Sequence, residues 1–335
     1  MVGAFKSRIR PVPTRKQRCA MDSSGKSTIL TLPLVSIITP TYNRVSYLDE
    51  TIRSVLSQDY PRIEYIVLDD GSTDNTIQAL EKYAGKLIYE THSNMGETRT
   101  VNKGWSMSHG EIVAVVNSDD PLLPGAVSAA VKFMESNTDI VVAYPDWDII
   151  GPDSQVKKHV RAPEYNYLDM VRYHRCHVGP GAFIRRTSIE LAGGRDPDIK
   201  YVADLEFWLR LGLYGKFARI PLTLATWRDH ADSVSNSCKS VEMAEEHIIL
   251  VQKYFSRSDL PKDIIKLKDD SMCWAYGVAA MACGFGIRLP LKYFYTAFTR
   301  YPVSFIKAVG HWHAWSAFVK AVFGSLLYGF RTRVN

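Results

Sequence analysis

The sequence predicts an α/β fold, with a mostly parallel, Rossmann-like sheet covered by helices on both faces and a helical C-terminal region after it. From residue 34 the hydrophobic period alternates between that of a strand and that of a helix, which implies parallel strands joined by helices. Five consecutive apolar residues at 112–116 are typical of a central parallel strand. Beyond residue 240 only helical periods remain. With 335 residues, the chain can hold both parts.

Each strand or helix is predicted from an uninterrupted apolar run or from apolar residues at helical spacing. A short apolar run closed by Thr39-Pro40 predicts the first strand, and apolar residues at helical spacing predict the helix after it. The strands are expected at 34–38, 63–68, 87–89, 112–116 and 140–143. The helices are expected at 48–56, 76–83 (with Asp74 as a cap), 97–107, 127–134, 248–255, 264–283, 291–298 and 315–330.

Polar clusters follow three of these strands: Tyr42-Asn43, residues 69–72 (DDGS) and residues 117–120 (NSDD). Ligands of such sheets bind at the carboxyl ends of the strands. Each cluster alone also suits a turn or a helix cap, but two of them hold adjacent carboxylates, which need a cation or hydrogen bonds. No G-x-G-x-x-G follows the first strand. We therefore predict a nucleotide with a metal on its phosphates rather than a dinucleotide cofactor.

Charge divides the chain into three parts. Residues 1–30 carry a net charge of +6, residues 31–270 of −7 and residues 271–335 of +7. The first thirty residues contain no apolar stretch of signal-peptide length, and the five cysteines form no C-x-x-C pair, so we expect a cytoplasmic protein without disulfides or a zinc cluster. The expected organisation is a basic flexible tail (1–33), an α/β domain (34–238) and a helical, basic and aromatic-rich region (239–335).

A set of short motifs follows in a fixed order along the chain: 35–43 (VSIITPTYN), 67–74 (VLDDGSTD), 94–96, 102–104, 110–111, 117–120, 124–125, 177–181 (HVGPG), 193–196 (GGRD), 204–210 (DLEFWLR) and 227–230 (WRDH). Each motif is weak alone, whereas the ordered set is specific. In this order the motifs resemble glycosyltransferase family 2, which has the GT-A fold, and the resemblance covers about 34–237.

The resemblance implies inverting transfer of a sugar from a nucleotide-diphosphate sugar to an acceptor hydroxyl. In that case Asp70 would hydrogen-bond the nucleobase, and Pro40 and Tyr42 would wall the base pocket. Asn117 would face the ribose, and Asp119 would bind the divalent metal. Asn117 stands where the family has the first Asp of its Asp-x-Asp motif, which removes one negative charge. The expected donor is a UDP-sugar, with GDP- and dTDP-sugars as alternatives.

The leaving diphosphate needs neutralisation, which Mg²⁺ or Mn²⁺ held by one or two carboxylates can supply. His230 is a second candidate ligand, which would favour manganese; a hydrogen-bonded histidine in a polar loop fits the sequence equally well. Arg99 is placed to reach the diphosphate, and a solvated helix charge is the alternative for this residue.

Asp204 is the predicted general base. It lies in the first turn of a predicted helix, where the helix dipole favours an ionised carboxylate; an N-cap is the structural alternative. Glu206 is the fallback candidate. His177, Gly179, Pro180 and Trp208 are the residues expected at the floor of the site or against the acceptor.

Residues 271–335 combine seven Lys and Arg residues with 15 aromatic residues and no acid. Cationic amphipathic helices of this kind lie in membrane interfaces, so we expect contact with the inner face of the cytoplasmic membrane and a saccharide or lipid-linked acceptor. Packing on the catalytic domain or on a second subunit is the alternative. The longest uncharged run, 271–287, is too short for a spanning helix of about 20 residues.

Three other functions compete. A nucleic-acid-binding protein is disfavoured because the acidic middle would repel the polymer. A nucleotidyltransferase would carry a Gly-rich loop after the first strand, and residues 40–44 contain no glycine. A catalytically silent homologue that binds nucleotide sugars remains open because of Asn117.

Overall fold

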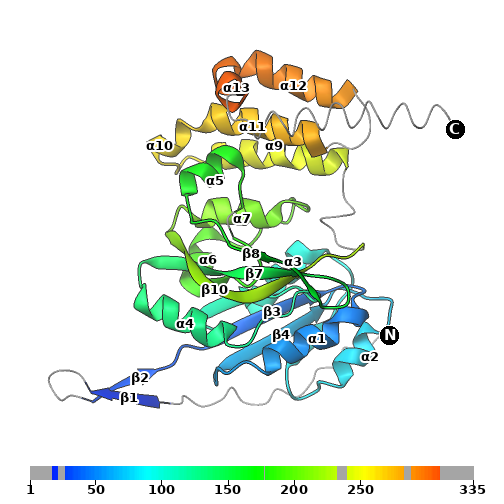
Figure 1. Cartoon of the computed structure of the whole chain (residues 1–335), viewed down its shortest axis with the longest axis vertical. Helices are drawn as coiled ribbons and strands as arrows, with labels where there is room; N and C mark the ends of the chain where they lie inside the picture. The colour runs from blue at the N-terminus through cyan, green and yellow to red at the C-terminus, as the bar shows by residue number, and fades with distance from the viewer. Residues whose placement is uncertain (1–16, 22–26, 177, 232–239, 283–287, 310–335) are drawn as a thin grey trace. The chain divides into compact units, whose positions relative to one another are not determined.

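The computed structural model describes residues 17–21, 27–176, 178–231, 240–282 and 288–309. They fall into two compact units (Figure 1). Unit 1 comprises residues up to 165 together with 178–194 and 214–229, and unit 2 comprises 166–177, 195–213 and the residues from 230 onward. Each unit is therefore built from segments that are distant in the sequence.

Unit 1 contains a mixed, mostly parallel sheet in the order β10-β7-β9-β6-β3-β4-β5, with β8 paired to β7. Strands β9 and β8 run antiparallel to their neighbours, and the other pairs are parallel. The strands are β3 (Val35–Thr41), β4 (Ile63–Asp69), β5 (Ile88–Thr91), β6 (Ile112–Val115), β7 (Ile140–Ile150), β8 (Val156–Val160), β9 (Phe183–Arg185) and β10 (Lys216–Arg228).

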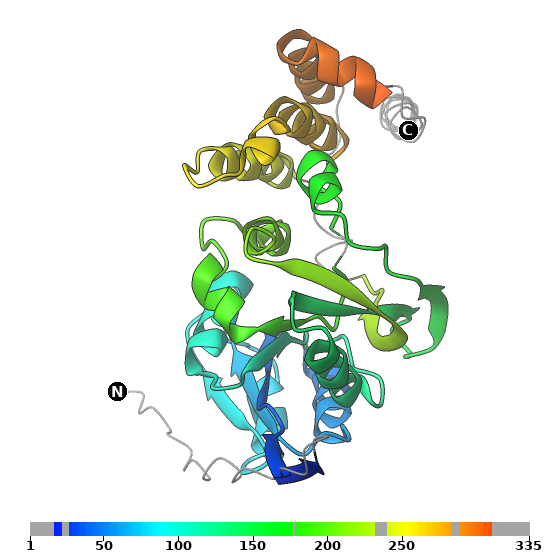
Figure 2. The same ribbon diagram turned by 90° about the vertical axis from the view of Figure 1, so that its left-hand side faces the viewer.

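Helices cover both faces of this sheet (Figure 2). On one face, Ile37 and neighbouring strand residues pack with apolar residues of α1 and α4, such as Ile52 and Val131. On the other face, Gly104 of α3 lies directly over Ile38, because a Cβ there would come within 2.5 Å of the Ile38 side chain. The helices of unit 1 are α1 (Val45–Leu56), α2 (Thr76–Glu81), α3 (Glu97–Met107), α4 (Ala126–Ser136) and α6 (Arg186–Ala192).

Unit 2 is helical. Its centre is α11, whose buried residues include Met272 and Ala279, and which packs against α5, α9, α12 and α13. The helices are α5 (Tyr167–Tyr173), α7 (Ala203–Leu211), α9 (Val241–Phe255), α10 (Lys262–Ile265), α11 (Lys268–Ala282), α12 (Arg288–Arg300) and α13 (Pro302–Val309). The pattern predicted at 315–330 lies outside the described residues.

The predicted fold class is confirmed, with the five predicted strands and the helices between them present; their ends lie within a few residues of the expected ones, except that the strand predicted at 140–143 extends to Ile150 as β7. Strands β8, β9 and β10 were not predicted. Strand β10 contains Pro221 and its register with β7 shifts between Ile220 and Thr223, which interrupts the alternation that a strand normally shows. Strands β1 (Gln17–Met21) and β2 (Ser27–Thr31), in the expected tail, form a separate antiparallel pair.

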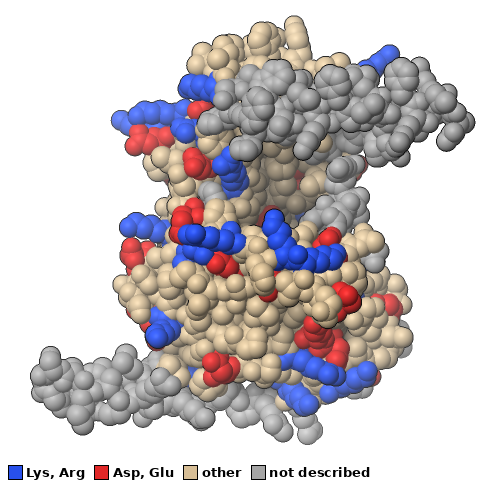
Figure 3. Space-filling model, viewed as in Figure 1, with Lys and Arg blue, Asp and Glu red and all other residues tan. Residues whose placement is uncertain are grey.

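On the face drawn in Figure 3, the described Lys and Arg side chains are interspersed with Asp and Glu side chains. Within the described residues, none of the helices is both long and apolar enough to cross a membrane.

Candidate active site

The three polar clusters lie at one edge of the sheet in unit 1, since β3 pairs in parallel with both β4 and β6. The first two clusters are tied together by Asn43, whose backbone adopts a positive φ of 51°. Its backbone N–H donates to the Ser72 hydroxyl at 2.8 Å, and its side-chain oxygen accepts from the Thr73 N–H at 2.8 Å. The predicted convergence of the clusters on one sheet edge is therefore present.

Asp70, predicted to contact the nucleobase, is buried and organises the loop before α3. Its two carboxylate oxygens accept the backbone N–H groups of Met95 at 2.7 Å and Gly96 at 2.9 Å. Gly71 adopts a φ of 76°, and a Cβ there would come within 2.8 Å of the Asn94 nitrogen. The tight approach of these two loops thus depends on a glycine after Asp70. Arg99, in the first turn of α3, is exposed.

The two residues predicted to wall the base pocket differ in exposure. Pro40 is buried within β3, opposite Leu68 of β4. Tyr42, one residue beyond the strand, is 45% exposed, which is high for a large aromatic side chain. Tyr42 is consequently available to stack on a planar ligand.

The third cluster is held in place by one side of α1. The Thr51 hydroxyl donates to the Ser118 carbonyl at 3.1 Å, and the Ser54 hydroxyl accepts from the Leu122 N–H at 3.0 Å. One turn further on, the Gln58 amide nitrogen donates to the Leu123 carbonyl at 3.0 Å. Thr51 and Ser54 share one side of α1 at a spacing of three residues, and Gln58 lies two residues beyond the end of the helix. The loop that carries Asp119 is therefore fixed by side chains of α1 and of the residues that follow it.

Within this cluster, the two carboxylates have different environments. Asp120 points inward, where it accepts the Arg228 backbone N–H at 2.8 Å and the Asn117 amide N–H at 3.1 Å. Burial, and then the neighbouring Asp119 carboxylate, raises the pKa of Asp120 to about 7. Asp119 retains 18% exposure of its side chain, and its Oδ2 lies 3.5 Å from Nε of Arg44. Asp119 is thus the carboxylate of this segment that faces solvent.

A divalent ion fits this edge only if most of its ligands are phosphate oxygens and water rather than protein side chains. The described part of the chain has no group of three or more His, Cys, Asp or Glu side chains arranged to hold a metal. Asp119 offers one accessible carboxylate, and Asn117 is exposed beside it. Mg²⁺ and its relatives bind in such places through one or two carboxylates, with substrate phosphates and water as further ligands.

Two further arginines, Arg44 and Arg228, lie at this edge of the sheet, and the sequence predicted no role for either. The Arg228 guanidinium is fully buried and donates from Nε to the Asp119 carbonyl at 2.9 Å and from Nη2 to the Glu50 carboxylate at 2.7 Å. Arg228 also lies over the Tyr47 ring, 4.7 Å from its centroid. Arg228 belongs to the quoted motif 227–230, and Arg44 directly follows the motif 35–43, so a basic residue in or next to a motif was the available signal.

The segment predicted to form the floor of the site lies against the sheet of unit 1. A Cβ on Gly179 would come within 2.5 Å of the Trp147 ring, and Gly181, with a φ of 73°, lies as closely on Ala225. Pro180 between them is half-buried. The glycines therefore permit a close approach that no side chain allows. His177 lies outside the described residues.

In unit 2, the two candidate bases on α7 differ in their partners. Glu206 is buried, and its carboxylate forms a two-pronged ion pair with the Arg210 guanidinium, with an Nη2–Oε2 distance of 2.7 Å. Asp204 is exposed, and its Oδ1 accepts the Leu205 N–H at 2.7 Å. The charge of Glu206 is thus neutralised by a partner, whereas the carboxylate of Asp204 faces solvent.

A buried pair of histidines lies behind Asp204. The rings of His174 and His247 stack at 6.1 Å with an interplanar angle of 6°, and His174 Nε2 lies 2.9 Å from the Ser271 hydroxyl. Burial lowers the pKa of His174 to about 3 and that of His247 to about 4, although the Asp204 carboxylate raises the latter. Both imidazoles are therefore neutral at pH 7 and leave the charge of Asp204 in place.

The other two predicted residues of unit 2 are buried. Trp208 is 7% exposed on α7, with its ring 5.3 Å from that of Phe207. His230 directly follows the last residue of unit 1 and is also buried.

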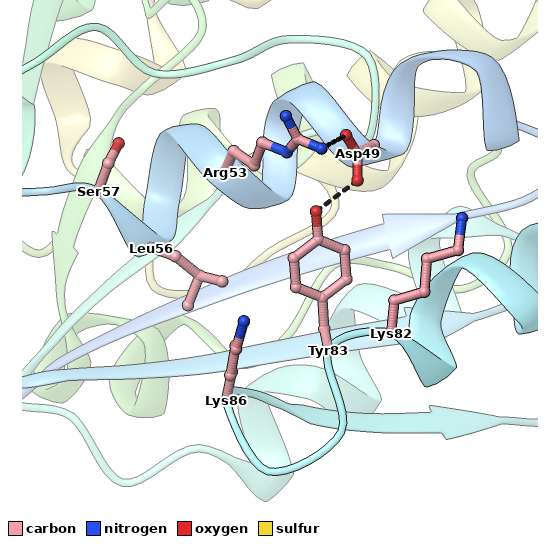
Figure 4. Close-up of a pocket in the computed structure, with 7 residues that line it drawn as sticks. All are labelled: Asp49, Arg53, Leu56, Ser57, Lys82, Tyr83 and Lys86. Carbon is pink, nitrogen blue, oxygen red and sulfur yellow. Dashed lines mark hydrogen bonds and ion pairs between the residues drawn. The ribbon is translucent and has the colours of Figure 1, made fainter.

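A shallow pocket elsewhere in unit 1 contains none of the predicted site residues (Figure 4). It lies between α1 and the end of α2, where the Tyr83 hydroxyl points at the Asp49 carboxylate, which also pairs with Arg53 at 2.7 Å. Arg53 is 73% exposed. This ordinary surface ion pair lies on α1, the helix that begins directly after Arg44.

Comparison with known proteins identifies the family. The model of glycosyl transferase family 2 matches residues 36–190. The putative teichuronic acid biosynthesis glycosyltransferase TuaG of Bacillus subtilis is 33% identical over 187 residues, which cover 53% of this chain and 72% of TuaG. The chain belongs to glycosyltransferase family 2. This family-2 chain is also 28% identical over 254 residues to the Escherichia coli UDP-Glc:alpha-D-GlcNAc-diphosphoundecaprenol beta-1,3-glucosyltransferase WfaP, covering 71% of the chain and 98% of WfaP.

Solved structures agree with the GT-A fold of this glycosyltransferase. S. aureus TarS 1–349 in complex with UDP-GlcNAc superposes with a TM-score of 0.60 at 19% identity, covering 86% of this chain and 89% of the other. The Pyrobaculum calidifontis mannosyltransferase PcManGT, in complex with GDP-Man and Mn²⁺, gives a TM-score of 0.52 at 18% identity, with coverages of 88% and 87%. The resemblance seen in the sequence is therefore confirmed at the level of family and fold.

Proposed function

We propose that this family-2 glycosyltransferase moves a sugar, with inversion at the anomeric carbon, from a nucleotide-diphosphate sugar to a hydroxyl of a saccharide or lipid-linked acceptor during cell-surface polysaccharide or glycolipid synthesis. The names of TuaG and WfaP support this class of product, and WfaP names a UDP-sugar donor. The observation that carries the proposal is the sheet edge of a family-2 fold that holds both an accessible carboxylate, Asp119, and an exposed aromatic ring, Tyr42.

Unit 1 is proposed to bind the donor. Tyr42 stacks on the base with Pro40 beneath it, Asp70 accepts a hydrogen bond from the base while it orders the loop before α3, and Asn117 faces the ribose. The Asp70 Oδ2 atom, which accepts the Gly96 N–H, keeps a second lone pair for such a bond, whereas Oδ1 also lies 3.4 Å from the His92 ring nitrogen. The exposed Arg99 reaches the diphosphate.

Asp119 would hold Mg²⁺ or Mn²⁺, with His230 as a further proposed ligand. The donor set of one accessible carboxylate fits an ion that binds mainly to phosphate oxygens, and the PcManGT complex contains Mn²⁺ with a nucleotide sugar. When bound, such an ion neutralises the charge that develops on the leaving diphosphate.

Asp204 is proposed as the general base. Its carboxylate accepts the proton of the acceptor hydroxyl as the hydroxyl oxygen forms its bond to the anomeric carbon; the bond to the diphosphate breaks on the opposite face, which inverts the configuration. Glu206 is the weaker candidate, since its charge is already neutralised by Arg210. Gly179 and Pro180 shape the floor of the site, with His177 and Trp208 near the acceptor.

The test combines a donor screen with two variants. Thermal-shift measurements with UDP-, GDP- and dTDP-sugars, with and without Mn²⁺, identify the donor because native-state binding raises stability. With that donor and a panel of saccharide acceptors, Asp204→Asn should lower turnover by about 10² to 10⁴ and leave donor affinity unchanged. Glu206→Gln should lower thermal stability more than it lowers turnover. Wild-type turnover in Asp204→Asn would remove Asp204 from its role, and sugar-nucleotide binding without diphosphate release would indicate a silent homologue.

We further propose that residues 34–238 form the transferase domain and that the region 239–335 contacts the inner face of the cytoplasmic membrane, which keeps a cytoplasmic enzyme near a lipid-linked acceptor. On α12 and α13 the side chains of Leu291, Tyr295, Phe298, Val303 and Ile306 are between 49% and 69% exposed. The basic residues Arg288, Lys292, Arg300 and Lys307 accompany them, without an acidic residue on either helix. Anionic lipid attracts such residues by about 1 kcal/mol each.

Flotation of the full chain with vesicles tests the membrane contact. Binding to vesicles that contain phosphatidylglycerol should exceed binding to phosphatidylcholine vesicles, and Tyr295→Ser combined with Ile306→Ser should reduce it. A matched double substitution of exposed apolar residues in unit 1, Leu56→Ser with Val156→Ser, serves as control. Equal flotation of all three proteins would contradict the proposal.

A further inference from the structure

Arg44 pairs with the carboxylate that the proposed function assigns to the metal. Its Nε lies 3.5 Å from Oδ2 of Asp119, with the two side chains 23% and 18% exposed. The Arg44 backbone is fixed, because its carbonyl accepts the N–H groups of Tyr47 and Leu48 in the first turn of α1. Its guanidinium reaches the Asn43 carbonyl only at 3.4 Å. A partly solvated side chain on a fixed backbone can change partners without a change of fold.

The pairing removes the charge that would attract a free cation. Of the cluster at 117–120, Asn117 is neutral and Asp120 points inward onto the Arg228 backbone N–H, so Asp119 alone faces solvent with a carboxylate. Arg44 offsets that single charge. Bringing a divalent ion onto Asp119 while Arg44 stays beside it adds repulsion between two cations a few Å apart. Asp119 in this state is a poor site for a metal ion alone.

The same guanidinium suits the donor. An arginine can bind phosphate through two parallel hydrogen bonds of about 2.8 Å, whereas Nε of Arg44 lies at a longer distance of 3.5 Å from Oδ2 of the Asp119 carboxylate. Arg44 lies directly before α1, whose first backbone N–H, that of Val45, already donates to the Asp74 carboxylate at 3.3 Å, so the phosphate contact rests on the guanidinium rather than on the helix end. A diphosphate of charge −2, a divalent cation, Asp119 and Arg44 together are electrically neutral.

We propose that Arg44 is a diphosphate-binding residue that pairs with Asp119 only while the donor is absent, so that Asp119 becomes available to the metal when the donor draws Arg44 away. This inference rests on the proposed function, because it requires a nucleotide-diphosphate donor at this edge. The proposal predicts that metal binding depends on the nucleotide. It also gives Arg44 two opposite effects: Arg44 lowers the affinity of the chain for free metal and raises its affinity for the nucleotide.

Binding measurements on the full chain separate these effects without turnover. Free Mn²⁺ is followed by its electron paramagnetic resonance signal with and without UDP, and UDP affinity is measured calorimetrically in EDTA. In Arg44→Ala, Mn²⁺ affinity without UDP should rise by up to about fivefold, the equivalent of a partly exposed ion pair. UDP affinity in EDTA should fall by about tenfold or more, as for a lost hydrogen bond to a charged group.

Three further variants complete the design. Arg44→Lys should keep part of both effects, since it retains the charge without the planar fork. Arg53→Ala, which removes an exposed ion pair from α1, the helix that follows Arg44, should leave both affinities unchanged. Adding Asp119→Asn to Arg44→Ala should abolish the gain in Mn²⁺ affinity. Wild-type affinities for both ligands in Arg44→Ala would overturn the proposal while leaving the transferase function in place. If the wild-type chain binds neither UDP, GDP nor dTDP, the proposed function fails, and this inference fails with it.

Discussion

The stability of unit 2 is expected to fall steeply between pH 7 and pH 5, because two buried histidines must stay neutral. His174 and His247 have pKa values of about 3 and about 4 in the folded chain, mainly because of burial. Their Nδ1 atoms are buried without a hydrogen-bond partner within the described residues. A proton added to either ring would therefore place a charge and an unsatisfied donor in the interior.

The sign and size of the effect follow from linkage. Each folded-state pKa lies below the unfolded value of 6.5, so the unfolded chain binds more protons, and stability is lost as the pH falls below 6.5. At pH 5, 1.5 units below the unfolded value, each histidine costs about 2 kcal/mol, or about 4 kcal/mol for the pair. Asp196 in the same unit does not add to this loss at pH 5, because its pKa is held below 3.8: burial opposes the shift, but hydrogen bonds, chiefly from Lys253, outweigh it.

Hydrogen exchange read by mass spectrometry can assign the loss to unit 2. Opening free energies of α9 and α11 peptides should decrease by about 4 kcal/mol from pH 8 to pH 5 after correction for the intrinsic exchange rate, whereas peptides of β3 and β6 should show no such decrease, because the raised pKa of Asp120 adds stability to unit 1 as the pH falls. The double variant His174→Gln with His247→Gln should lose most of this pH dependence. As a control, His159→Gln removes an exposed histidine of unit 1. A pH-independent wild type, or a double variant with an undiminished loss, would refute the reasoning.

The remaining predictions concern unit 1. Arg228→Met should destabilise this unit by about 3 kcal/mol in urea unfolding, because it leaves the Asp119 and Gly151 carbonyls without their buried donor; a change below 1 kcal/mol would contradict a structural role for the guanidinium. Tyr42→Ala should weaken UDP binding in calorimetry by about fivefold to a hundredfold through lost stacking, and Tyr42→Phe should not. Gly179→Ala should lower the thermal midpoint, equivalent to about 1 to 3 kcal/mol, since its Cβ would overlap the Trp147 ring; an unchanged midpoint would show that the ring moves freely.

The sheet could be predicted because its signals are local. Runs such as 112–116 and spacings such as Leu48, Ile52 and Val55 depend only on neighbours in the sequence, and each became the buried side of its element. Strand β9 has three residues, too few for a period, and pairs with β6 and β7 from distant parts of the chain. Its position is set by tertiary contacts that no local pattern encodes.

The site was predictable at the level of segments and not at the level of side chains. The sequence places Asp119 and Asp120 side by side without indicating which carboxylate faces solvent, and the answer depends on the Arg228 backbone N–H, 108 residues away. Similarly, Asp204 and Glu206 both lie in the first turn of α7, and only the position of Arg210, one turn on, separates an exposed carboxylate from a neutralised one.

Arg44 and Arg228 contact different parts of the loop at 117–120: Arg228 binds its backbone, and Arg44 pairs with the Asp119 side chain. The buried Arg228 and Thr51 hold the consecutive carbonyls of Asp119 and Ser118, so the backbone of the loop is fixed whether or not a ligand is present. Arg44 pairs with the Asp119 carboxylate of this loop, and both side chains are partly solvated. A change of partner by Arg44 therefore alters the charge at the sheet edge without moving the loop. For this reason, substitution of Arg228 should act on stability, and substitution of Arg44 on ligand affinity.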